Sequence, residues 1–381
     1  MGTRPENAAG RYLMIDALRG LACLAVVFFH AKEGGHINAL VLAAPAWFGQ
    51  LLTHGDSGVA IFFVISGFVM ANSVLRQEVT AGYVGRFLAR RSLRLDPPYW
   101  AAIALAILSA YVSAKFIPNR VFEMPSALDL AAHVTYLADL VKQPLVNPAF
   151  WTLCIEIQFY LSFVLLVWLL TRLTRYMGRK RATDLVVWTC AVVAALWVTN
   201  WAPFHVHGLF LDHWYLFIVG VLVWRAVDTQ KATETVVALC NIAVLGVLLV
   251  VYSGKSQDMI GLAVALLIIL SGYTGWLKTV GGGALLQWLG LISYSLYLTH
   301  NTVTGAAFNG AYRLLGRGPL VEALCLALVV SACCVFAWVF FLAFEKPGLR
   351  WSKLVPMRRA QPKAPAAGVA MEPCVSFTSK R

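Results

Sequence analysis

Residues 13–31 read LMIDALRGLACLAVVFFHA, and this stretch decides the class of fold. It is apolar over about 20 residues, the length that an α-helix needs to cross the hydrocarbon core of a bilayer. Asp16 and Arg19 interrupt it, and no small-residue cleavage site follows. We therefore expect a permanent membrane span here rather than a cleaved signal peptide.

Apolar stretches of similar length recur along the rest of the chain. Together they predict about ten transmembrane helices, at about 13–31, 58–75, 98–117, 150–170, 185–201, 208–226, 235–252, 258–277, 284–303 and 320–344. The composition agrees, with 60% hydrophobic residues, 13% charged residues and a mean hydropathy of +0.72. Soluble domains carry about 25% charged residues, so this chain is too apolar to fold in water. We expect an all-α polytopic membrane protein whose main partner is membrane lipid.

The distribution of basic residues predicts the orientation of the chain in the membrane. If it crosses ten times, 23 of the 31 Lys and Arg residues fall on the side of the amino terminus and 7 on the other side. This asymmetry is the positive-inside rule, and it predicts that both termini are cytoplasmic. It also explains the net charge of +13 without a nucleic-acid partner. The cysteines show no metal-binding spacing, so no metal is expected.

These features divide the chain into three parts. Residues 1–12 form a cytoplasmic amino-terminal segment, and residues 13–350 form the transmembrane domain. Residues 351–381 include a stretch rich in Ala, Pro and Lys, which predicts a disordered cytoplasmic tail.

Arg19 and His30 are ionisable residues inside the first expected span. Such residues cost roughly 2.5–3.5 kcal/mol or more in a bilayer, so each is a functional candidate. The two residues are eleven positions apart, which at 100° per residue places them within about 20° of the same helix face. The same spacing separates them by roughly 16 Å along the helix axis. Alternatively, Arg19 binds a backbone carbonyl and His30 lies at the membrane interface.

The predicted topology brings further polar residues to the level of His30. Asp56 stands at the outer end of the second span, Glu156 in the outer half of the fourth, and His300 at the outer end of the ninth. A histidine beside a carboxylate has the chemistry of a general base that activates a hydroxyl. The same level also holds Trp151, Tyr297 and the pair Asp212 and His213, for which a structural, interfacial role is favoured.

The opposite, cytoplasmic side carries Arg90, Arg91 and Arg94 between the second and third spans. Closely spaced arginines offer planar, bidentate donors suited to phosphate groups, although they also fit ordinary positive-inside charge. Pro97 and Pro98 follow them and are expected to stop a helix. An anion-binding mouth on one side and a His–carboxylate cluster on the other suit a long donor such as coenzyme A.

Five segments in this order resemble the acyltransferase-3 family of membrane O-acyltransferases. They are IDALRG at 15–20 leading to His30, GVAIFFVISGF at 58–68, RRSLRLDPPY at 90–99, FWTLCIEIQFY at 150–160 and GLISYSLYLTH at 290–300. They spread over about residues 12–347, which is most of the chain.

The resemblance implies transfer of an acyl group, usually acetyl, from cytoplasmic acyl-CoA to a hydroxyl. His30 would be the catalytic base, either acting in a ternary complex or becoming acylated first. Arg19 would serve the donor together with the Arg90, Arg91 and Arg94 set, and Glu156 would support the site as a catalytic residue. Trp151, Tyr297 and His300 would contact the substrate.

Position 60 departs from the family pattern, because many members carry Asp where this chain has Ala60. Asp56, four residues earlier on the same helix face, is the candidate replacement as the carboxylate that pairs with His30.

The resemblance leaves the acceptor open between a polysaccharide or oligosaccharide and a small molecule such as a macrolide. It implies the bacterial inner membrane, and separate glycan-assembly proteins as possible partners. A transporter of a lipid-linked sugar is the main competing class, and it predicts inverted repeats or paired broken helices, which the sequence lacks. A structural or sensing protein would leave the aligned His, Glu and Arg residues unexplained.

Overall fold

The computed structural model describes residues 12–116, 121–174, 178–201, 206–253 and 256–357. Within these residues the regular secondary structure is entirely helical, and there is no strand. The first part of the chain forms α1 (Leu13–Glu33), α2 (Asn38–Ala43), α3 (Ala46–Thr53), α4 (Ser57–Val74), α5 (Ala81–Phe116), α6 (Ala127–Val134) and α7 (Trp151–Leu173). The rest forms α8 (Arg179–Val198), α9 (Trp214–Thr229), α10 (Ala232–Leu248), α11 (Ser256–Thr274), α12 (Trp276–Thr279), α13 (Ala284–Leu315), α14 (Pro319–Phe340) and α15 (Lys346–Leu354).

Eight helical segments in the described part of the chain are long and apolar enough to cross a membrane. They coincide with the expected spans one to seven and ten; the remaining two expected spans are occupied by α11 and by the 32-residue α13. The prediction of an all-α polytopic membrane protein is therefore confirmed. The predicted amino-terminal segment and most of the predicted tail fall at 1–11 and 358–381, outside the described residues.

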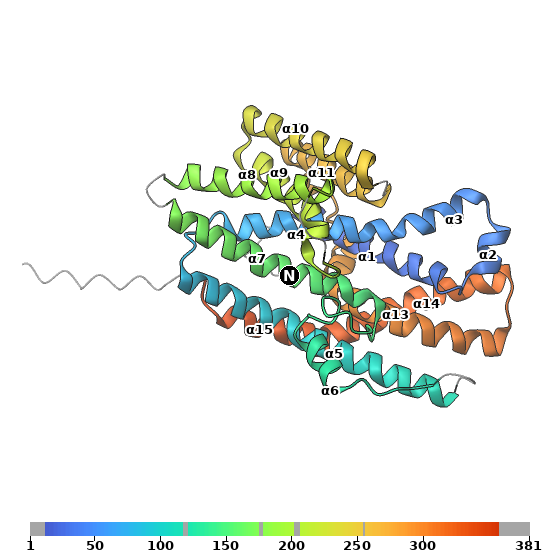
Figure 1. Cartoon of the computed structure of the whole chain (residues 1–381). Coiled ribbons are helices and arrows are strands. Elements are labelled where there is room, and N and C mark those ends of the chain that lie inside the picture. Colours follow the sequence, from blue (N-terminus) through green and yellow to red (C-terminus); the bar gives the residue numbers. More distant parts are fainter. Residues whose placement is uncertain (1–11, 117–120, 175–177, 202–205, 254–255, 358–381) are drawn as a thin grey trace, which may run out of the picture.

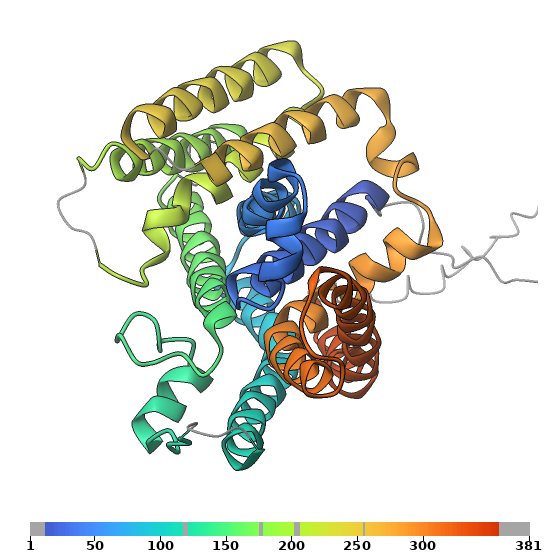
Figure 2. The ribbon, with the colours of Figure 1, turned by 90° about the vertical axis from the view of Figure 1, so that its right-hand side faces the viewer.

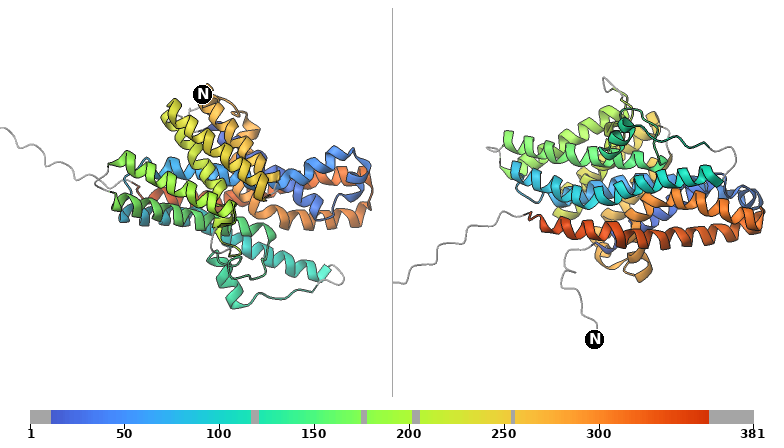
Figure 3. Two further views of the ribbon diagram at one scale, coloured as in Figure 1. Left: turned by 45° about the horizontal axis from the view of Figure 1, so that its top comes forward. Right: turned by 90° about the horizontal axis from the view of Figure 1, so that it is seen from below.

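The helices run mostly side by side, with α1 and α4 at the centre of the bundle (Figures 1 and 2). Seen end-on in Figure 2, α8, α10 and α11 lie along one side of this pair and α13 and α14 lie on another. The outer part of α5 leans away from the bundle together with α6, as the left view of Figure 3 shows.

Close backbone contacts hold α1 between α4 and α13. A Cβ atom added at Gly58 of α4 would lie 2.4 Å from the Ala22 carbonyl oxygen of α1. One added at Gly290 of α13 would lie 2.2 Å from the Asp16 carbonyl oxygen of α1. Inside a membrane the hydrophobic effect does not drive helices together. Small residues such as these glycines let two helices approach closely, and the resulting van der Waals contacts hold the helices together. They fix the face of α1 that carries Arg19 and His30 against both neighbours.

α5 corrects the expectation that Pro97 and Pro98 stop a helix, because it runs through both of them. Proline lacks an N–H, so these two residues leave the Leu93 and Arg94 carbonyls without their usual helical donors. Gly348 of α15 packs directly onto these carbonyls, and a Cβ atom there would meet the Leu93 oxygen at 2.7 Å. Prolines are tolerated in membrane helices whose freed backbone groups are covered by neighbouring helices. The arginines therefore lie on a continuous helix and not on a loop.

Candidate active site

Three cavities follow one another along α4. The histidine cavity, of about 230 Å³, is lined by His30, Asp56, Val59, Ala60, Phe63, Trp151, His213, Asp258 and Tyr297, among others. The middle cavity, of about 60 Å³, is lined by Arg19, Val59, Phe62, Phe63, Ser66, Thr152, Glu156, Ser293, Tyr294 and Tyr297, among others. The arginine cavity, of about 440 Å³, is lined by Val69, Ser73, Tyr83, Phe87, Arg90, Arg91, Arg94, Ser352 and Lys353, among others. From Asp56 to Ser73 the helical path covers about 25 Å, so the cavities span most of a bilayer.

His30 faces the histidine cavity from the end of α1. Its Nδ1 lies 2.9 Å from the Val26 carbonyl oxygen, one turn earlier in the same helix. A carbonyl only accepts hydrogen bonds, so Nδ1 carries the hydrogen in the neutral ring and Nε2 keeps a lone pair. This is the protonation state that a general base requires.

His300 lies behind His30 rather than in the cavity. It is fully buried, its Nε2 lies 3.3 Å from His30 Nδ1, and the two ring centroids are 5.0 Å apart. It lines none of the three cavities. α13 turns the His300 ring toward α1 instead of toward the open space, and its expected contact with substrate stays a prediction.

Two carboxylates line the histidine cavity, and the sequence pointed to one of them. Asp56 ends the short 3₁₀ turn between α3 and α4, and its Oδ1 is buried without a hydrogen-bond partner in the described residues. Asp258 on α11 accepts a hydrogen bond of 2.8 Å from the Tyr215 hydroxyl and is 4% exposed. Sequence reasoning missed Asp258 because it stands at the start of an expected span, where charged residues are common.

Aromatic rings form one wall of the histidine cavity. The Trp151 ring centroid lies 5.3 Å from that of His213 and 6.3 Å from that of Phe63. His213, for which a structural role was favoured, therefore lines the cavity beside Trp151. Tyr297 also lines it, and a 2.7 Å hydrogen bond joins the Tyr297 hydroxyl to Thr152.

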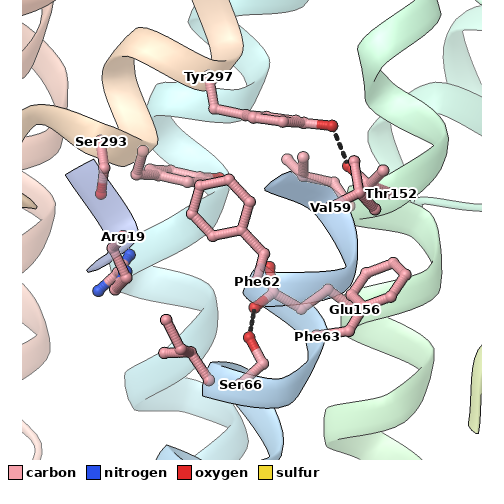
Figure 4. A pocket seen from close by; sticks show the side chains of 12 residues that line it. Arg19, Val59, Phe62, Phe63, Ser66, Thr152, Glu156, Ser293 and Tyr297 are labelled. Carbon is pink, nitrogen blue, oxygen red and sulfur yellow. Dashed lines mark hydrogen bonds between the residues drawn. The ribbon is translucent and has the colours of Figure 1, made fainter. Parts of the chain in front are cut away.

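The middle cavity brings together Arg19 and Glu156 from opposite sides, from α1 and α7 respectively (Figure 4). No salt bridge or hydrogen bond to Arg19 occurs among the described residues, so none of their backbone carbonyls binds it. Glu156 accepts a hydrogen bond of 2.5 Å from the Ser66 hydroxyl. It does not line the histidine cavity, because it lies five residues beyond Trp151 on α7, about 140° around and roughly 7.5 Å deeper.

Tyr160 stands between the middle cavity and the arginine cavity. Its hydroxyl donates a hydrogen bond to Glu156, and its side chain is 4% exposed. The guanidinium carbon of Arg91 lies 3.9 Å above its ring centroid, which is a cation–π contact. One aromatic side chain thus links the carboxylate of the middle cavity to a cation of the arginine cavity.

The arginine cavity is strongly basic. Arg90 and Arg94 lie one turn apart on α5, with Arg91 beside them, and Lys353 of α15 faces the same space. Among the described residues no carboxylate lies within salt-bridge distance of these four side chains. The Nε atom of Arg91 is also buried without a hydrogen-bond partner there. Such a set of unpaired cations is suited to an anionic ligand.

Glu345 is a further buried carboxylate that sequence reasoning missed. It ends a π-helical turn, Phe341–Glu345, between α14 and α15, and it is 3% exposed. The Ser295 hydroxyl donates a 2.6 Å hydrogen bond to it. A π-helical turn shifts the register of a helix by one residue, and such turns occur frequently at functional sites. The available signal was a Glu-Lys-Pro sequence directly after the last apolar run.

Comparison with known proteins identifies the family. The family model described as an acyltransferase domain, acyltransferase-3, matches residues 12–341, which is most of the chain. The chain belongs to the acyltransferase-3 family. Residues of the five segments that resemble the family line part of each cavity. The protein is an acyltransferase that transfers groups other than aminoacyl groups.

Individual relatives agree with the family assignment. A Komagataeibacter xylinus protein named as a membrane-bound transacylase is 28% identical over 90% of this chain and 84% of its own length. Nodulation protein 10 of Rhizobium leguminosarum bv. viciae is 30% identical over 52% of this chain and 53% of its own length. A Staphylococcus aureus (strain COL) protein named as an O-acetyltransferase is 22% identical over 87% of this chain and 56% of its own length. The chain thus spans about half the length of the latter two relatives, and no solved structure matches it.

Proposed function

We propose that this acyltransferase moves an acyl group, most simply acetyl, from acyl-CoA on the cytoplasmic side to a hydroxyl of a carbohydrate acceptor on the other side. The observation that carries the proposal is the row of three cavities along α4. One end holds arginines that form no salt bridge among the described residues, and the other holds His30. We place the protein in a bacterial inner membrane, where separate glycan-assembly proteins would supply the acceptor.

The donor would bind with its phosphates in the arginine cavity. Arg90, Arg91 and Arg94 provide fork-shaped donors that match phosphate oxygens, and no protein carboxylate competes for them among the described residues. The pantetheine arm would pass Tyr160 and Arg19 and bring the thioester toward His30. The roughly 16 Å that separate Arg19 from His30 along α1 require a long, narrow arm of this kind.

The acceptor would enter the histidine cavity. Trp151, Phe63 and Tyr297 offer apolar ring faces, and Asp56 offers carboxylate oxygens to hydroxyl groups, a combination that suits a sugar. His30 Nε2 would take the proton of the acceptor hydroxyl while the hydroxyl oxygen forms a bond to the thioester carbonyl carbon. The C–S bond then breaks, and the proton passes from His30 to the departing CoA sulfur, which restores the neutral imidazole.

The test measures transfer from radiolabelled acetyl-CoA by the purified protein in proteoliposomes, with polysaccharide and oligosaccharide acceptors offered separately. We expect labelled ester on a carbohydrate, and we expect loss of at least about 10²-fold in kcat for His30→Ala, the usual contribution of a general base. His54→Ala is the matched control, because His54 lies at the same end of the bundle, is exposed and does not line the histidine cavity.

Full activity of His30→Ala would overturn the assignment of the base. Labelled ester on a macrolide but on no carbohydrate would overturn the acceptor class. Movement of substrate across the vesicle membrane without any ester product would favour the transporter.

A further inference from the structure

His300 is a buried histidine that the proposed reaction does not yet use. Its Nδ1 lies 2.7 Å from the Tyr297 carbonyl oxygen and 3.2 Å from that of Leu296. Both partners are backbone acceptors, so Nδ1 of His300 carries the hydrogen in the neutral ring and its Nε2 keeps a lone pair. This lone pair faces His30.

The four contacts of the two rings fit one pair of tautomers. His30 Nδ1 donates to the Val26 carbonyl at 2.9 Å and stands 3.3 Å from His300 Nε2, which accepts. If His300 carried its hydrogen on Nε2 instead, two N–H groups would face each other, and the carbonyls of Leu296 and Tyr297 would lose the side-chain donor. The arrangement therefore holds the His30 lone pair on Nε2, the atom that the base uses.

We propose that His300 is a positioning residue that holds His30 in its basic tautomer and stabilises the imidazolium that forms when His30 takes the acceptor proton. This inference rests on the proposed role of His30 as general base. In Ser-His-Asp sites a carboxylate orients and stabilises the histidine. Here no carboxylate of the described residues lies within salt-bridge distance of His30, and the group in contact with its Nδ1 side is a neutral imidazole.

The position of the two helices makes this pairing a property of the fold. His30 and His300 are carried by α1 and α13, whose backbones approach closely at Gly290, ten residues before His300. His300 is fully buried, which excludes water as a competing donor to its Nε2. Its own N–H is bound to carbonyls that accept but do not take up a proton, so His300 stabilises charge rather than relaying the proton onward.

The test compares His300→Leu, which removes the acceptor at similar size, with His300→Gln, whose side-chain carbonyl reaches about as far as the ring Nε2. We expect kcat of His300→Leu to fall about 100-fold with both KM values unchanged. This is less than the about 10⁴-fold loss seen when a catalytic histidine adopts the wrong tautomer, because Val26 still holds the His30 N–H. We expect His300→Gln to recover most of the lost kcat.

His133→Leu is the matched control, since His133 is also fully buried and bonded through Nδ1 to a carbonyl one turn earlier, but lies outside the three cavities. Rates are taken per folded protein, measured by size exclusion and thermal unfolding in detergent. Wild-type kcat in His300→Leu, while His30→Ala is inactive, would overturn this inference and leave the proposed function intact. Equal loss in the Leu and Gln variants with raised KM values would assign His300 to packing alone. Activity in His30→Ala would instead overturn the proposed function.

Discussion

Replacing Arg94 with Gln removes one cation from the arginine cavity while keeping much of the side-chain volume. A hydrogen bond between charged groups contributes about 1.5–3 kcal/mol, and each 1.4 kcal/mol corresponds to about a tenfold change in affinity. Among the described residues no carboxylate lies within salt-bridge distance of Arg94 and no ring contacts it, so a bound phosphate would displace neither kind of contact. We therefore expect Arg94→Gln to raise the donor KM by about 10- to 150-fold.

Arg91→Gln should have a smaller effect, and the structure gives the reason. Arg91 rests 3.9 Å above the Tyr160 ring, a contact that contributes about 0.5–2 kcal/mol and is lost if the guanidinium turns toward a phosphate. The net contribution of Arg91 to donor binding is then about 1 kcal/mol, which corresponds to about a fivefold rise in KM for Arg91→Gln. The order of the two variants is thus part of the prediction.

The assay measures initial rates of acyl transfer in proteoliposomes against acetyl-CoA concentration at saturating acceptor. We expect kcat to stay within about twofold of wild type, because both arginines lie far from His30 and affect binding rather than the chemical step. Arg172→Gln is the control, since Arg172 is exposed in the last turn of α7 at the same end of the bundle. An unchanged KM in Arg94→Gln, or an equal rise in Arg172→Gln, would refute this model of donor binding.

Three further predictions concern the packing and the acceptor side. Gly290→Ala should destabilise the protein by about 1–3 kcal/mol, because the added methyl group would collide with the α1 backbone. Gly305→Ala on the same helix should not, because the space around Gly305 is open. Thermal unfolding in detergent measures both effects. Trp151→Ala should raise the acceptor KM by about tenfold and leave the donor KM unchanged, as steady-state kinetics with each substrate varied would show. Tyr297→Phe should cost about 0.5–1.5 kcal/mol of stability, and a double-mutant cycle with Thr152→Val should assign that cost to their shared hydrogen bond.

The sequence predicted the positions of the membrane helices well because the apolar runs are long and most of them are bounded by charged residues. It also predicted that Arg19 and His30 share one face of α1, since that depends only on helical periodicity. It did not predict that α5 continues through Pro97 and Pro98. That outcome depends on Gly348 of a distant helix, which covers the carbonyls that the prolines leave free.

The assignment of polar residues to individual cavities was the weaker part of the prediction. Topology gives the depth of a residue but not the rotation of its helix about its own axis. Glu156 was therefore expected at the level of His30 but lines the middle cavity, and the ring of His300 lies behind that of His30. The roles expected of both residues stay predictions. Asp258 and Glu345 were missed because both stand at the end of an apolar run, where the sequence pattern does not distinguish a buried carboxylate from an exposed one.

The partition of the interior into three cavities also bears on the electrical insulation of the membrane. An enzyme that accepts one substrate from each side risks opening a water path through which protons would dissipate the transmembrane potential. Tyr160 contacts Glu156 of the middle cavity and Arg91 of the arginine cavity, and Phe63 and Tyr297 line both the middle cavity and the histidine cavity. If the proposed function holds, these aromatic side chains would separate the two aqueous ends and so limit the leakage of ions through the enzyme.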